Sequence, residues 1–195
     1  LPGIFQFTIG SCSWIFLSGL VANVGGDEGS AGYQTAIRLL LFFMLPAWGM
    51  SNGAATLVGQ NLGAKHPERA EESVYKTIKY NMIYMGFVTL ISLAASGLLA
   101  AIFSNDAAVR QIASKALLIL STGYIFYGIG MVMMSAFNGA GDTWATTKLN
   151  FIGFWLFQVP LVYVLAKTFH WETTGVFIAI PISQTFIAIT SYLLF

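Results

Sequence analysis

Charged residues are scarce in this sequence. Only 9% of its 195 residues are charged and 56% are hydrophobic, whereas a soluble domain carries about 25% charged residues. A soluble chain of this length needs a polar surface over its core, and nine basic and eight acidic residues are too few to provide one. The composition therefore excludes an ordinary soluble domain and favours a protein whose solvent is lipid.

Cysteine and excess positive charge are also lacking. The single cysteine, Cys12, lies in an apolar run, which excludes an internal disulfide framework and a cysteine-rich metal site. We expect neither a metal nor a cofactor. A net charge of +1 gives no basic cluster for phosphate backbones, so we expect no nucleic-acid partner. Residues 1–20 lack the pattern of a signal peptide, and both ends of the chain resemble cuts within a longer protein.

Long apolar runs fill the rest of the sequence. A helix needs about 20 apolar residues to cross the hydrocarbon core of a bilayer, and only helices or closed barrels satisfy their backbone there. The runs lack the alternation of barrel strands. We therefore predict an all-α integral membrane protein, a single lobe over residues 1–195. Its six spans are expected at about residues 2–24, 31–58, 80–103, 107–137, 149–169 and 173–195.

Basic residues in the connections indicate the orientation, because cytoplasmic loops are enriched in Lys and Arg. The second and fourth connections and their flanks hold five such residues: Lys65, Arg69, Lys76, Lys79 and Lys148. The other connections hold three: Arg110, Lys115 and Lys167. This bias predicts that the loops at about 63–79 and 138–148 are cytoplasmic.

Arg38 is the one charged residue well inside a predicted span, and all eight acidic residues lie outside the spans. At helical spacing, Gln34, Arg38, Trp48 and Asn52 fall on one stripe. The stripe suits a wall of a water-filled cavity. Equally, Arg38 can extend to the outer interface while Gln34 and Asn52 bond neighbouring helices.

Further candidates for a substrate cavity are Gln6 in the first span and one face of the fourth span. That face carries a tyrosine and two methionines, which have flexible, polarisable side chains: Tyr127, Met131 and Met134. Methionine and aromatic side chains suit a pocket for varied apolar ligands. They suit ordinary helix packing as well, and the residues alone leave both readings open.

The second span and its end contain a proline and four regularly spaced glycines. Pro46 removes one backbone hydrogen bond and bends a helix, so it is either a hinge or a fixed bend. The pairs Gly49 with Gly53, and Gly59 with Gly63, have the small-xxx-small spacing that lets helices approach closely. We predict that these four glycines serve helix packing.

Two sequence motifs are more specific than the apolar pattern that all membrane helices share. Residues 46–64 followed by 67–70 resemble the signature of the multidrug and toxic compound extrusion (MATE) exporters, and residues 137–143 resemble the second marker of that family. The matching positions are Gly59, Gln60, Asn61, Gly63 and Ala64 in the first motif, and Gly139, Gly141, Asp142 and Thr143 in the second. Locally, Gly63 suits the left-handed residue after a helix, and Asp142 with Thr143 suits a helix start.

The resemblance implies the C-terminal six-helix lobe of a twelve-helix transporter in the bacterial inner membrane, with an N-terminal lobe, lipids and small molecules as partners. The implied function is not enzymatic. It is antiport, the export of amphipathic, often cationic compounds in exchange for H⁺ or Na⁺ through alternating access. Part of the family carries acids where this chain has Gly10 and Tyr127, so we expect the coupling ion to bind mainly in the N-terminal lobe. A related lipid-linked oligosaccharide flippase, with a basic cavity, is the alternative, and a membrane enzyme or channel is a third possibility.

Overall fold

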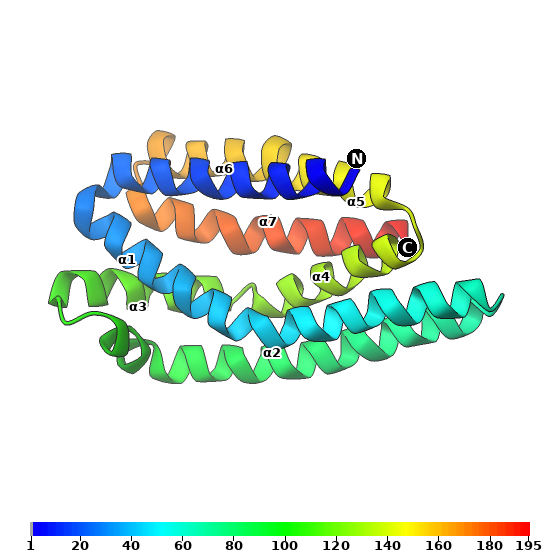
Figure 1. The fold of residues 1–195 in the computed structure, drawn as a ribbon. Coiled ribbons are helices and arrows are strands. Elements are labelled where there is room, and N and C mark those ends of the chain that lie inside the picture. Colours follow the sequence, from blue (N-terminus) through cyan, green and yellow to red (C-terminus); the bar gives the residue numbers. More distant parts are fainter. Residues whose placement is uncertain (1) are drawn as a thin grey trace.

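The computed structural model describes residues 2–195 and is built of helices that run back and forth along one axis (Figure 1). No strand occurs within these residues, which confirms the all-α prediction. In chain order the elements are α1 (Pro2–Gly63), α2 (Pro67–Phe103), α3 (Ala107–Ser121), α4 (Tyr124–Gly139), α5 (Thr143–Asn150), η1 (Phe151–Gln158), α6 (Val159–Tyr163), η2 (Val164–Thr168) and α7 (Glu172–Leu194).

Helix α1 makes two passes. Its 62 residues would extend about 93 Å at 1.5 Å per residue, roughly three times the thickness of a hydrocarbon core. The chain reverses at Gly26, which has φ 60° and ψ −156°, a conformation open to glycine because it has no Cβ. The predicted loop over residues 25–30 is therefore wrong in length, because helix resumes directly after Gly26.

Six passes result when the remaining helices are added. Four helices among the described residues are long and apolar enough to cross a membrane, and the bent pair α3–α4 makes a fifth candidate. Counting α1 as two crossings gives the predicted number. Successive passes are antiparallel, so the turns at 64–66 and 140–142 lie at one end of the bundle together with both termini (Figure 1).

Helix α2 begins at Pro67, thirteen residues before the predicted start of its span. The charged segment 67–79 is helical because one face packs: Ala70, Val74 and Ile78 are buried against the ends of α1 and α4. On the exposed face Lys76 Nζ lies 2.7 Å from Glu72 Oε1. This hydrogen bond and the positive charge hold the pKa of the Glu72 carboxyl below its usual value.

The fourth pass is broken, whereas the sequence predicted one helix over 107–137. Helices α3 and α4 meet at 58° around Thr122 and Gly123. At this break Gly123 lies against α7, where an added Cβ would sit 2.7 Å from the Cα of Pro181. Asp106 caps the start of α3, and its Oδ1 accepts a hydrogen bond from Ala108 N at 2.8 Å.

The fifth pass runs from Thr143 to Thr168 and begins six residues before its predicted start. Two stretches within it, η1 and η2, are π-helical, with hydrogen bonds one residue longer than in an α-helix. They flank α6, which contains Pro160 near its first turn. The sixth pass, α7, agrees with the predicted 173–195 to within one residue.

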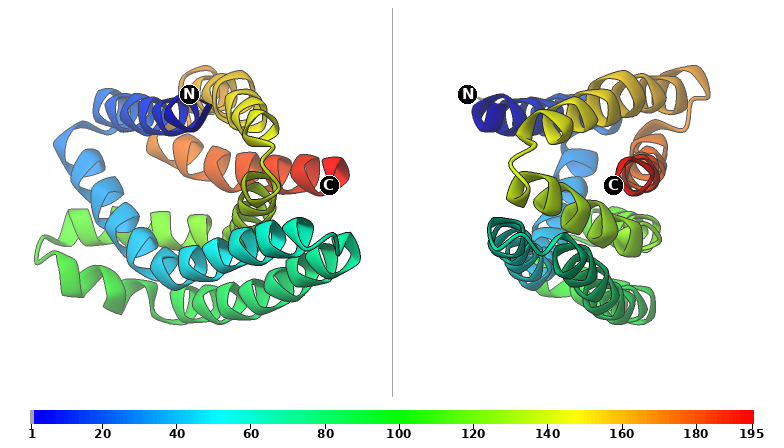
Figure 2. Two further views of the ribbon diagram at one scale, coloured as in Figure 1. Left: turned by 45° about the vertical axis from the view of Figure 1, so that its right-hand side comes forward. Right: turned by 90° about the vertical axis from the view of Figure 1, so that its right-hand side faces the viewer.

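The passes stack so that the first half of α1 (residues 2–25) and the fifth pass form one side of the bundle and α2 the opposite side (Figures 1 and 2). Helices α7 and α4 lie between them, and the main core forms around Tyr33 and Phe177, whose rings stack at 6.2 Å. The exterior is apolar: Leu98, Ile102 and Leu193 are each more than 70% exposed. Such an exterior requires lipid as its solvent.

Candidate functional site

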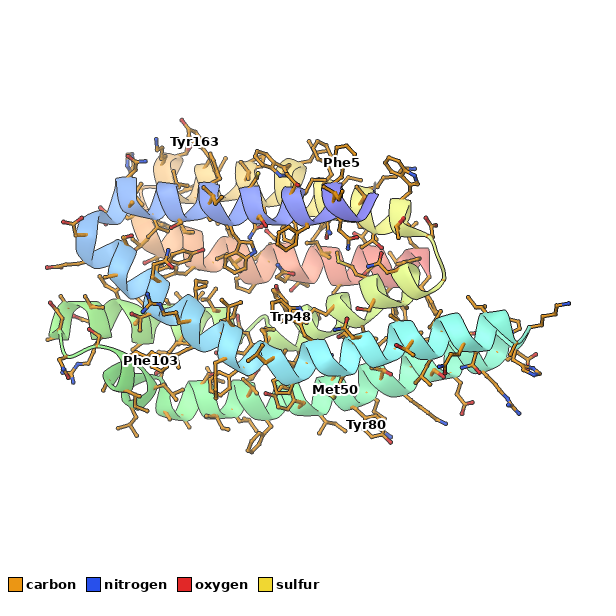
Figure 3. The ribbon with its side chains drawn as sticks, in the orientation of Figure 1. Phe5, Trp48, Met50, Tyr80, Phe103 and Tyr163 are labelled. Atoms are coloured by element: carbon orange, nitrogen blue, oxygen red, sulfur yellow. The ribbon has the colours of Figure 1, made fainter. Side chains whose placement is uncertain are left out.

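A cleft of about 440 Å³ opens between the two halves of α1 and the end of α5. We call it the inner cleft, because Trp48 lies between the two sides of the bundle (Figure 3). Its lining residues come from three places in the sequence: Gly3, Gln6, Phe7, Gly10, Ser11, Trp14, Trp48 and Asn150.

The inner cleft combines aromatic walls with neutral polar groups. Trp14 and Trp48 supply indole rings, and Gln6, Ser11 and Asn150 supply hydrogen-bonding groups. The Asn150 side chain is 6% exposed, and its Oδ1 is buried without a hydrogen-bond partner among the described residues. Indole rings beside hydrogen-bonding side chains suit a flat apolar molecule that also carries polar groups.

Two predicted cavity residues, Gln6 and Trp48, meet in this cleft although 42 positions separate them. Sequence reasoning missed Ser11, Trp14 and Asn150. Asn150 did carry a signal, since it is an amide at the start of a strongly apolar run. Its neighbours in space were not predictable from periodicity within one helix.

The predicted polar stripe is divided. Gln34 and Arg38 line a second cleft of about 460 Å³ beside Asp27 and Ser104, at the end of the bundle opposite the termini. Gln34 Nε2 donates to Ser18 Oγ at 2.8 Å and so joins the two halves of α1. Asn52 is exposed but is not part of the lining of either cleft.

The face of the fourth pass that was predicted to line a cavity is partly buried inside the bundle. Tyr127, Met131 and Met134 are half-buried, and the first two pack against the main core. The backbone carbonyl of Met134 accepts a hydrogen bond from Thr146 Oγ1 at 3.4 Å. None of the three lines the inner cleft.

Acidic side chains are all exposed and lie near helix ends. They are Asp27, Glu28, Glu68, Glu71, Glu72, Asp106, Asp142 and Glu172. Within residues 2–195 the one ion pair joins Glu72 to Lys76. The described part of the chain therefore offers no buried carboxylate for binding a cation.

Pro46 lies in a helix that neighbouring side chains support. Helix α1 keeps helical geometry at this position, and α2 contacts the carbonyls around it. Tyr84 Oη donates to the carbonyl of Phe43 at 2.9 Å, and Asn81 Nδ2 donates to the carbonyl of Ala47 at 3.3 Å and to Ser51 Oγ at 3.2 Å. These bonds tie α2 to α1 on both sides of Pro46.

The two motif segments touch. A Cβ on Gly59 would lie 3.2 Å from the carbonyl oxygen of Gly139, and a Cβ on Gly139 would lie 2.8 Å from the Cα of Ala55. Gly59 therefore packs closely within this lobe. At Gly49, Gly53 and Gly63 no atom of this lobe lies within 4 Å of an added Cβ, so their predicted role in helix packing stays a prediction.

The other motif residues shape the two turns. Helix α1 does end at Gly63, with Ala64 N donating to the carbonyl of Gln60 at 3.0 Å. The prediction that Gly63 is left-handed is wrong, because Lys65 takes that conformation, at φ 61°.

Around the second turn, Gly141 has φ 86°, and Asp142 Oδ1 accepts from Ala145 N at 2.9 Å. This bond confirms the predicted cap. Thr143 opens α5 and accepts a hydrogen bond at its carbonyl from Thr147 Oγ1 at 2.7 Å. In the first motif Asn61 Nδ2 donates to the carbonyl of Leu57 at 2.8 Å.

Known proteins resemble this chain in sequence and in fold. The chain is 29% identical over 180 residues to the probable multidrug resistance protein NorM of Mannheimia succiniciproducens, an alignment that covers 89% of the chain and 38% of that relative. All of the chain superposes on an outward-facing multidrug resistance MATE family transporter (TM-score 0.93, 22% identity, 44% of that chain). It superposes equally on an inward-facing one (TM-score 0.91, 22% identity, 45% of that chain).

The chain thus spans about two fifths of the length of this relative and these structures. The family model MatE matches residues 2–164, which include both motifs, the first four passes and most of the fifth. On this match and this fold, the chain belongs to the MatE family, the multidrug and toxic compound extrusion transporters of membranes.

Proposed function

We propose that this lobe is half of a secondary active antiporter that exports amphipathic, often cationic compounds in exchange for H⁺ or Na⁺. The observation that carries the proposal is the inner cleft, which joins two indole rings to neutral polar groups inside a membrane-spanning bundle. Indole faces attract both apolar rings and cations. A cargo that is flat, apolar and positively charged therefore matches the lining.

Alternating access is proposed on the constancy of the fold. The lobe resembles an outward-facing and an inward-facing transporter almost equally well. A lobe that keeps one shape in both states is suited to rock as a unit against a second lobe. The second lobe, in this proposal, is an N-terminal six-helix unit, with the cargo site between the two.

The coupling ion is proposed to bind mainly in that N-terminal lobe. Buried carboxylates are the usual carriers of coupled ions in membranes, and all eight acids of this chain are exposed near helix ends. The proposal is tested by export from proteoliposomes with either a proton or a sodium gradient. Replacing the exposed acids here should leave the dependence on that gradient unchanged.

An inner membrane location is proposed with the turns at 64–66 and 140–142 in the cytoplasm. Five basic residues lie near these turns, and the two turns share one end of the bundle (Figure 1). Basic residues are retained on the cytoplasmic side. Labelling of single cysteines placed at Ala64 and Ala140 from inside and outside the cell tests this orientation.

The decisive variant for cargo binding is Trp48→Ala in the full-length protein. We expect it to raise the KM for export of a cationic dye severalfold, because aromatic stacking is lost. Trp171→Ala is the matched control, since Trp171 is about as exposed as Trp48 but lies in a turn. Equal behaviour of the two variants would refute the assignment of the inner cleft.

The flippase alternative is disfavoured by the same lining. A cavity for a pyrophosphate needs several basic side chains, and no Lys or Arg lines the inner cleft. Arg38 lines the other cleft, beside Asp27.

A further inference from the structure

A second groove lies on the other side of the same helix pair. It has a volume of about 400 Å³, and we call it the outer groove. Its lining comes from the start of α1 and from the α5–η1 segment: Phe5, Ile9, Trp144, Thr147, Lys148, Phe151 and Ile152. Trp155 Nε1 donates to the carbonyl of Ile9 at 3.2 Å and holds the two helices side by side.

The outer groove faces away from the inner cleft. At 100° per residue, the mean direction of Phe5 and Ile9 lies roughly 150° around α1 from that of the α1 residues that line the inner cleft. Phe5 lies at the outer edge of the bundle, whereas Trp48 lies between its two sides (Figure 3). The groove is therefore on a side of the lobe that meets lipid.

Lys148 is the one charged residue in the lining. It is exposed, and its ammonium takes part in no ion pair found within residues 2–195. The acid nearest in sequence, Asp142, is six residues away and its carboxylate caps α5. The groove thus presents a positive charge without a neutralising carboxylate in its wall.

Along the fifth pass the charged residue of the groove comes first, near the end of the bundle, and the apolar wall follows it. Trp144 and Lys148 lie in α5 near the end of the bundle, and Phe151 and Ile152 continue the wall toward the middle of the membrane. Tryptophan and lysine are typical of the headgroup level of a bilayer. The outer groove is apolar and has one positive charge near its end, so it suits a molecule with an apolar tail and a negatively charged head.

We propose that the outer groove binds an anionic phospholipid, with an acyl chain against Phe5, Ile9 and Ile152 and the phosphate at the ammonium of Lys148. Basic pockets between membrane helices on the cytoplasmic side bind anionic headgroups in this way. The choice of the cytoplasmic leaflet rests on the orientation proposed above. The lipid site itself depends neither on that orientation nor on transport.

The test measures lipid retention by native mass spectrometry of the full-length protein in detergent. Phosphatidylglycerol, which is anionic, is compared with phosphatidylcholine carrying the same acyl chains. A lysine near an anionic surface contributes about 1 kcal/mol, so we expect Lys148→Gln to reduce the preference for phosphatidylglycerol about fivefold. Lys148→Arg should retain it. Lys115→Gln, at the other end of the bundle, is the control and should change nothing.

A second variant tests the apolar wall separately. Ile9→Trp fills the groove and leaves the backbone carbonyl of Ile9 in place, so retention of both lipids should fall, whereas Ile15→Trp on the exposed apolar surface should not affect it. Soluble glycerol phosphate at the same concentration should not be retained. Unchanged preference in Lys148→Gln, unchanged retention in Ile9→Trp, or equal retention of glycerol phosphate would each overturn the proposal. Because retention is read without transport, its failure leaves the proposed export function standing.

Discussion

Gly139 at the end of α4 lies directly against Ala55 of α1, so that a Cβ on residue 139 would be 2.8 Å from the Cα of Ala55. Backbone atoms form this contact, and a flexible side chain cannot relieve it. The two motif segments, about 80 residues apart, are therefore packed face to face. This contact gives a physical reason for glycine at position 139, since any other residue would push α4 away from α1.

The first prediction concerns this contact. Gly139→Ala should destabilise the protein by about 1–3 kcal/mol, the usual cost of overpacking, as measured by thermal unfolding in detergent. Gly53→Ala is the matched control, because a Cβ there meets nothing within 4 Å and alanine favours helix. Similar losses for both variants would argue against a specific contact.

The second prediction concerns the support of the Pro46 region. Asn81 is fully buried and bonds both Ala47 and Ser51. Asn81→Ala should cost about 1–3 kcal/mol, since it removes both bonds and leaves the carbonyl of Ala47 without this donor. Thermal unfolding again provides the measurement. The control is Asn61→Ala, where the amide is near the surface and bonds its own helix. A smaller loss for Asn81→Ala than for Asn61→Ala would contradict this role.

The third prediction concerns the cap of α5. Asp142→Ala should cost about 0.5–2 kcal/mol and should speed amide hydrogen exchange at Ala145, whose N–H bonds the carboxylate. Asp142→Asn should behave almost as wild type, because asparagine also caps helices. Exchange at Ala108, capped by Asp106, serves as the internal reference. Unchanged exchange at Ala145 would show that the cap is dispensable.

Hydropathy predicted the number of passes, because each apolar run has to cross the same thickness of lipid. Hydropathy did not predict where each helix begins and ends when that boundary lies in a polar segment. The charges of residues 67–79 indicate a loop, yet Ala70, Val74 and Ile78 give this segment a buried face. The break at Gly123 was not predictable for a similar reason, since it lies where Gly123 packs against Pro181, 58 residues later in the chain.

The candidate site was only partly predictable. The stripe from Gln34 to Asn52 spans 18 residues, about 27 Å of helix, so it is too long to line one compact cleft. Periodicity shows which residues share a face of one helix. It does not show which helices face each other, and the meeting of Gln6, Trp48 and Asn150 depends on the latter.

The linings of the inner cleft and the outer groove imply that one face of the first half of α1 meets water and the opposite face meets lipid. Residues 10 and 12 test it, because they are two positions apart in the helix and about 160° apart around it. Gly10 lines the inner cleft and has room for a side chain, and the native Cys12 is exposed on the other face. A thiol at either position is thus not covered by neighbouring side chains. The two positions differ by only about 3 Å along the helix axis.

The most direct measurement compares Gly10→Cys in a Cys12→Ser background with the wild type, each as full-length protein in membranes treated with a water-soluble maleimide. Thiols react as thiolates, which form in water and not among acyl chains. We expect the thiol introduced at position 10 to be labelled and to be protected by a transported dye, whereas Cys12 should stay unmodified. Labelling of Cys12 with no labelling at position 10 would contradict this expectation.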